Sequence, residues 1–104
     1  MNTPEYLDLV RERLHLPSDY ALQKPLGVSK QLISNYRTGK EILSDTVALR
    51  VAEIIGMHPG LVVLDMHRQR SKTSEEATIW DDIYKGFRTL LPHAKIERRL
   101  SAVR

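Results

Sequence analysis

Hydrogen-bonding side chains recur at helical spacing shortly after residue 29. They are Lys30, Gln31, Ser34 and Asn35, at positions i, i+1, i+4 and i+5. In an α-helix this spacing brings all of them to one face. A carboxamide can bond N6 and N7 of adenine together, and a lysine suits O6 and N7 of guanine or a phosphate. The pattern therefore predicts a helix whose outer face reads base edges in the major groove of DNA.

The surrounding stretch, Ser18 to Gly39, predicts two short helices joined by a tight turn. The apolar positions that would lock the pair together are Leu22, Leu26, Val28, Ile33 and Tyr36. Gly27 stands where the chain must reverse, because glycine adopts a positive φ without strain. Ser29 is expected to cap the second helix, which runs from about Lys30 to Arg37 and ends at Gly39. This arrangement is a helix-turn-helix.

Other residues of the same stretch are candidates for the sugar-phosphate backbone. Ser29 would act from the helix N-terminus, where backbone N–H groups already attract anions. Arg37, Thr38 and Lys40 leave the second helix in a position that suits phosphates. Such contacts orient a protein on a duplex but carry no sequence information.

Helices are also predicted on either side of this stretch. Thr3-Pro4-Glu5 reads as a capped helix start, followed by an apolar stripe at Tyr6, Leu7, Val10 and Leu14. Leu16-Pro17 should stop that helix, and Ser18 or Asp19 should cap the next one. Pro25 predicts that this second helix is short or kinked, because proline lacks the N–H that a helix interior needs.

Residues 1–68 are expected to form one helical domain. Ser44-Asp45 starts its fourth helix, which Gly56 ends, and His58-Pro59-Gly60 opens the fifth. Residues 69–73 are polar and basic, as in a linker or a frayed helix end. In residues 74–104, Ser74 starts a sixth, amphipathic helix that precedes a basic tail. Its aromatic and aliphatic stripe supplies candidates for dimerisation: Ile79, Trp80, Ile83 and Phe87.

Composition narrows the functional class. The chain of 104 residues has no cysteine and a net charge of +3, which suits a polyanionic partner without proving one. We expect no signal peptide, no membrane span, no cofactor and no enzyme activity, because no nucleophile–base pair or phosphate-cradling loop is evident. His15, His58, His67 and His93 lack ligand spacing, so no metal site is expected. The expected location is the cytoplasm of a bacterium or of a phage-infected host, at the nucleoid.

Several spaced motifs resemble the Cro/λ-repressor-like helix-turn-helix family, also called XRE. The matching segments, within about residues 3–66, are Leu26-Gly27-Val28-Ser29, Ile33-Ser34-Asn35-Tyr36, Gly39-Lys40 and residues 48–57. The resemblance implies an all-α fold, namely a five-helix λ-repressor-like domain with an additional C-terminal amphipathic helix. It also implies a phage or prophage regulator of the repressor or Cro/C1 type, which binds double-stranded DNA as a homodimer on a palindromic operator.

Two positions depart from the family pattern. Gln23 stands where a small alanine usually packs the two helices together. Asp19 stands where a phosphate-binding glutamine is common, and an acid there would repel DNA. We therefore expect Ser18 and Tyr20 to make the backbone contacts on this side of the motif.

Other interpretations of the C-terminal part stay open. The aromatic stripe in residues 74–104 could fold back on its own core instead of forming a dimer. The basic tail could grip phosphates or simply keep the chain soluble. The alternative function is an antitoxin or anti-repressor module, whose C-terminal helix binds a protein partner.

Overall fold

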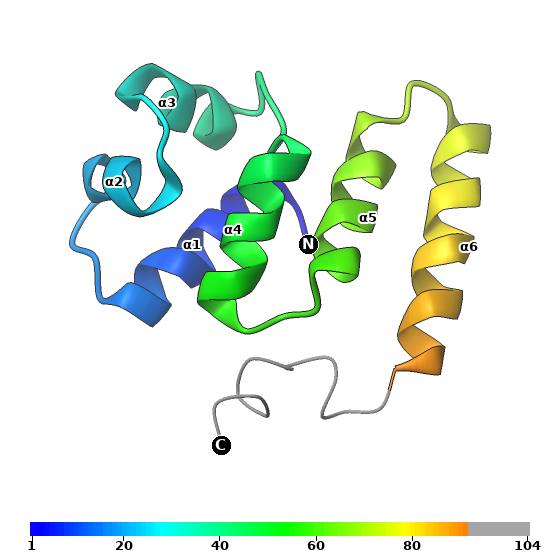
Figure 1. Cartoon of the computed structure of the whole chain (residues 1–104). Helices are drawn as coiled ribbons and strands as arrows, with labels where there is room; N and C mark the ends of the chain where they lie inside the picture. Colours follow the sequence, from blue (N-terminus) through cyan, green and yellow to red (C-terminus); the bar gives the residue numbers. More distant parts are fainter. Residues whose placement is uncertain (92–104) are drawn as a thin grey trace.

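The computed structural model describes residues 1–91, and every regular element in that part of the chain is helical (Figure 1). The elements are α1 (Thr3–Leu14), η1 (Tyr20–Leu22), α2 (Gln23–Leu26), α3 (Lys30–Thr38), α4 (Asp45–Ile55), α5 (Pro59–Arg70) and α6 (Ser74–Leu90). The predicted all-α class is confirmed. The basic tail predicted after Pro92 lies outside the described residues.

The cap of the first helix lies one residue before the predicted one, and the helix begins at Thr3. Asn2, not Thr3, is the N-cap, and its Oδ1 accepts a hydrogen bond from the Glu5 backbone N–H at 2.9 Å. The Glu5 carboxylate accepts in return from the Asn2 N–H at 2.8 Å, which completes a capping box. Thr3 is buried instead, with its hydroxyl 3.4 Å from Oε1 of Gln69.

The apolar stripe of α1 is shorter than predicted. Tyr6, Leu7 and Val10 are fully buried, whereas Leu14 is 39% exposed. The reason is that His15 adopts a left-handed conformation, with φ of +55°, and turns the chain away directly after Leu14. The helix therefore ends before the proline signal at residue 17.

One hydrophobic core joins α1 to α5. Its buried members come from these five helices, from η1 (Leu22) and from the loop before α4 (Leu43): Tyr6, Leu7, Val10, Leu22, Leu26, Ile33, Tyr36, Leu43, Val47, Ala48, Val51, Ala52, Ile55, Val62 and Met66. Leu32 is partly buried against this cluster. Burial of these side chains supplies the main driving force for folding.

The first two residues of the segment predicted as a linker or a frayed helix end, Gln69 and Arg70, are helical. α5 continues to Arg70, so only residues 71–73 separate it from α6. Arg68 and Arg70 stay in the helix because each finds a partner: Arg68 pairs with Asp65, and Arg70 donates to the Leu43 carbonyl. The cap of α6 also moves by one residue, since the Thr73 hydroxyl accepts from the Glu76 N–H at 3.1 Å.

Aromatic side chains hold α6 against α5. Trp80 stacks on His67 with ring centroids 4.6 Å apart, and Phe87 meets the ring of His58 edge-on at 5.1 Å. A Cβ atom added at Gly60 would lie 2.7 Å from Phe87 Cε2, so this close approach requires glycine. The part of the stripe formed by Trp80 and Phe87 thus folds back on the same subunit.

The rest of the stripe faces away from α5. Ile79, Ile83 and Leu90 are exposed by 55%, 45% and 81%. The broad apolar stripe of the sequence is therefore divided between two faces of α6, and none of its side chains is fully buried. Trp80 and Phe87 thus make contacts within the subunit, their part in a dimer stays a prediction, and Ile79 and Ile83 stay available for one.

Candidate nucleic-acid interface

The turn that positions α3 has the predicted geometry. Gly27 ends α2 in the left-handed region, with φ of +66°. The Ser29 hydroxyl then accepts from the Leu32 N–H at 3.1 Å and caps α3. Gly39 ends α3 with φ of +83°, as expected. These local signals fix both ends of the helix that carries the candidate reading face.

The helix before the turn starts differently from the prediction. Neither Ser18 nor Asp19 caps it through a side chain; the chain enters through the short 3-10 turn η1. α2 itself is a single turn that contains Pro25, which confirms the expected short helix. Gln23, a departure from the family pattern, opens α2 and donates to the Tyr20 carbonyl at 3.2 Å.

The predicted reading residues lie together on the outer side of α3. Lys30, Gln31 and Ser34 are exposed, and Asn35 is half-buried. On the opposite side of the same helix, Ile33 and Tyr36 are buried, so the orientation of α3 is set by the core. α3 lies at one edge of the molecule, and α6 lies at the other (Figure 1).

A hydrogen-bonded chain crosses this face. Gln31 Nε2 donates to Asn35 Oδ1 at 3.0 Å, and Asn35 Nδ2 donates to Glu41 Oε2 at 3.0 Å. Sequence reasoning missed Glu41, because it lies in the loop after Gly39, outside the helical spacing. The available signal was indirect: a helix that ends in a left-handed glycine turns the following residues back along its last turn.

Most of the predicted phosphate contacts are accessible. Ser18, Tyr20, Ser29, Thr38 and Lys40 are exposed, with Tyr20 at 68%. Lys30 is exposed as well, and within residues 1–91 neither Lys30 nor Lys40 forms an ion pair. The Thr38 hydroxyl donates to the Ser34 carbonyl at 3.0 Å but can still accept.

Arg37 is the exception. Its guanidinium donates to both carboxylate oxygens of Asp19, at 2.9 and 2.8 Å, and pairs with Asp8 at 2.9 Å. Arg37 thereby ties α3 to α1 and to the residue before η1, and its guanidinium is engaged by carboxylates of the same chain.

The same contacts alter the expectation for Asp19. The hydrogen bonds from Arg37 hold the pKa of the Asp19 carboxyl below its ordinary value, and Arg11 lies 3.1 Å from the same carboxylate. Asp19 is therefore a compensated charge, not the bare repulsive acid that the sequence suggested.

Replacing Asp19 by asparagine should lower stability in a pH-dependent way. Because the folded-state pKa is depressed, the ion pair stabilises the fold above the unfolded pKa of about 3.9 and is lost as pH falls through the folded-state pKa. We expect Asp19→Asn to cost about 1 kcal/mol at pH 7, since the carboxylate is 32% exposed. Urea denaturation of the wild type and the variant at pH 7 and pH 3 measures this loss of stability. An equal loss at the two pH values would contradict the prediction.

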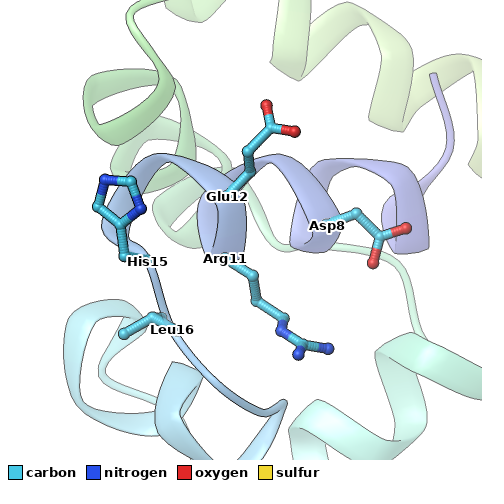
Figure 2. Close-up of a pocket in the computed structure, with 5 residues that line it drawn as sticks. All are labelled: Asp8, Arg11, Glu12, His15 and Leu16. Atoms are coloured by element: carbon cyan, nitrogen blue, oxygen red, sulfur yellow. The ribbon is translucent and has the colours of Figure 1, made fainter.

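A surface depression also runs along α1, but the charged side chains that line it have a structural role. It has a volume of about 420 Å³ and is lined by Asp8, Arg11, Glu12, His15 and Leu16 (Figure 2). Arg11 and Glu12 project to opposite sides of α1, and Arg11 is engaged by Asp19. A charged and open depression lacks the apolar enclosure that is typical of small-molecule sites.

Residues 1–91 contain neither a metal-binding cluster nor a membrane-spanning helix. No group of His, Asp or Glu side chains there is arranged to hold a metal ion. In the same part of the chain, no helix is long and apolar enough to cross a membrane. His58 and His67 instead serve as packing surfaces for Phe87 and Trp80.

Comparison with known proteins gives one informative relative. No family model and no solved structure matches the chain. The chain is 35% identical over 81 residues to the uncharacterized protein Gp-c of Pseudoalteromonas phage PM2. That match covers 73% of this chain and 87% of the phage protein. The chain therefore belongs to the same family as Gp-c, a family with a member encoded by a bacteriophage.

Proposed function

We propose that this protein is a sequence-specific DNA-binding transcriptional regulator of the phage repressor or Cro type. The observation that carries the proposal is the placement of α3. Ile33 and Tyr36 hold it in the core, and its opposite side offers polar side chains to a ligand. A relative in a bacteriophage and the motif resemblance to the Cro/λ-repressor-like family support the same assignment.

Each side chain of the interface then has a defined role. α3 enters the major groove, where Gln31, Asn35, Lys30 and Ser34 face base edges. Ser18, Tyr20, Ser29, Thr38 and Lys40 contact sugar and phosphate groups. Arg37 is reassigned from a phosphate contact to a positioning residue, because Asp19 and Asp8 occupy its guanidinium.

The small area that one module buries, and the limited discrimination of its base contacts, favour a dimer on the DNA. A single small module buries roughly 600–1,000 Å² on DNA, and each good base contact contributes about 1–3 kcal/mol of discrimination. Two copies on half-sites one helical turn apart would supply the missing specificity. The exposed face of α6, formed by Ile79, Ile83 and Leu90, is the proposed dimer surface.

The helix dipole of α6 favours an antiparallel pair. Two antiparallel copies would place the positive N-terminus of each helix beside the negative C-terminus of the other.

Selection from a random pool of duplexes tests the function. We expect enrichment of a two-fold symmetric sequence, whose affinity falls steeply as salt rises because bound phosphates release counterions. Equal affinity for the selected duplex and a scrambled one, at both low and high salt, would refute a sequence-specific regulator.

Ile83→Asp tests the dimer surface. A charge at the centre of the exposed face should convert a dimer into a monomer, because burying it unpaired is costly. Leu49→Asp is the matched control, since Leu49 is 52% exposed on α4. Analytical ultracentrifugation should find the control dimeric and the Ile83 variant monomeric, and a dimeric Ile83 variant would contradict the assignment.

The exposed face of α6 also favours a second candidate function. An antitoxin or anti-repressor would use Ile79, Ile83 and Leu90 to bind a different protein. A wild-type chain that is monomeric in ultracentrifugation and selects no DNA sequence would favour this alternative over the regulator.

A further inference from the structure

We propose that Glu41 is a specificity-determining residue of the interface, and that it selects a base that presents an exocyclic amine in the major groove, cytosine or adenine. The inference rests on the proposed function. It adds an acidic group to a reading face that the sequence describes as purely neutral and basic.

The position of Glu41 is held by two bonds to one residue. Its backbone N–H donates to the Asn35 carbonyl at 3.2 Å, and its carboxylate accepts from Asn35 Nδ2 at 3.0 Å. The loop that carries Glu41 is thus fastened to the last turns of α3. Glu41 is exposed, so its second carboxylate oxygen is open to a ligand.

The carboxylate also sets the direction of the hydrogen-bonded chain. An ionised carboxylate can only accept, so Asn35 must turn its NH₂ group toward Glu41 and its Oδ1 toward Gln31. Gln31 then donates through Nε2 and leaves its own Oε1 free. The chain therefore offers an acceptor at both ends, Gln31 Oε1 and the Glu41 carboxylate, and only Gln31 also keeps a second N–H to donate.

The acceptors at Gln31 and Glu41 match bases that present an exocyclic amine in the major groove. Cytosine presents N4–H₂ and adenine presents N6–H₂ in the major groove, whereas guanine and thymine present the acceptors O6 and O4 at the equivalent place. A negative charge facing O6 or O4 is repulsive and leaves both groups without a donor. Glu41 thus favours cytosine and adenine, which donate to it, and disfavours guanine and thymine, which present acceptors.

Glu41→Gln separates this role from general electrostatics. The amide keeps the size of the side chain and its bond to Asn35, but it can also donate and so tolerates guanine or thymine. Glu12→Gln is the matched control, because it removes the same charge from an exposed residue of α1. Both variants lose a negative charge and should therefore bind every duplex more tightly. The quantity to compare is the ratio of affinities for duplexes that differ in one base, at each position of the selected site.

At one position of each half-site, we expect Glu41→Gln to reduce the preference for cytosine or adenine by about tenfold, with no change in the control. A selected site whose base preferences are identical in wild type, Glu41→Gln and Glu12→Gln would overturn the role of Glu41 and leave the regulator intact. A wild-type protein without any base preference would overturn the regulator, and Glu41 with it.

Discussion

Replacing Asp65 by alanine is expected to lower the free energy of unfolding by about 3–5 kcal/mol. Asp65 is fully buried in α5, where the Tyr6 hydroxyl donates to its Oδ2 at 2.5 Å and Arg68 pairs with its Oδ1. Burial and this hydrogen bond raise the pKa of the Tyr6 phenol. Removal of the carboxylate leaves the buried Tyr6 hydroxyl without an acceptor, which is costly. It also removes one partner each from the N-terminal ammonium group and from Arg68, which are partly exposed.

Two further variants separate the contribution of the buried Asp65 carboxylate to stability from the contributions of the groups around it. Tyr6→Phe removes one donor and should cost about 1–3 kcal/mol. Asp81→Ala removes the other carboxylate of Arg68, 2.8 Å away on the outside of the molecule, and should have a far smaller effect. Urea denaturation followed by circular dichroism compares all variants. If Asp65→Ala unfolds at the same urea concentration as Asp81→Ala, the buried network does not carry the stability assigned to it.

The elements that the sequence predicted best depend on local signals. α3 and α4 each have a serine cap, a buried apolar stripe and a left-handed glycine at the end. These features act within a few residues, so they can be recognised before the fold is known. The same local logic predicted the short helix around Pro25 and the exposed polar face of α3.

Partners that are distant in sequence could not be predicted. Arg37 finds Asp19 at a separation of 18 residues, and Tyr6 finds Asp65 at 59. Nothing in the residue types indicated that Arg37 would prefer these acids to a phosphate. The division of the chain at residues 69–73 stays a prediction, although Arg68 of α5 also pairs with Asp81 of α6.

The two faces of α6 illustrate a different limit of prediction from the sequence. A helical stripe of apolar residues indicates that a helix is amphipathic, but not how many surfaces it meets. Trp80 and Phe87 turned to His67 and His58, a pairing of aromatic rings that hydropathy alone does not encode. The residual face of Ile79, Ile83 and Leu90 became visible once that packing was known.

The largest functional effect is expected from Gln31→Ala and Asn35→Ala. Each contact contributes about 1–3 kcal/mol of discrimination, and a two-fold site contains each contact twice, so the affinity for the selected duplex should fall about 30-fold or more. Affinity for a scrambled duplex should change little, because phosphate contacts dominate it. Thr78→Ala, on the exposed surface of α6, serves as the control.

The two substitutions should not be additive. Gln31 donates to Asn35 at 3.0 Å, so loss of either side chain releases the other from its orientation. In a double-mutant cycle, the double variant should therefore lose less binding free energy than the sum of the single losses. Fluorescence anisotropy titrations with the selected and scrambled duplexes provide the four values. Equal losses on both duplexes would mean that α3 contacts the backbone and not the bases.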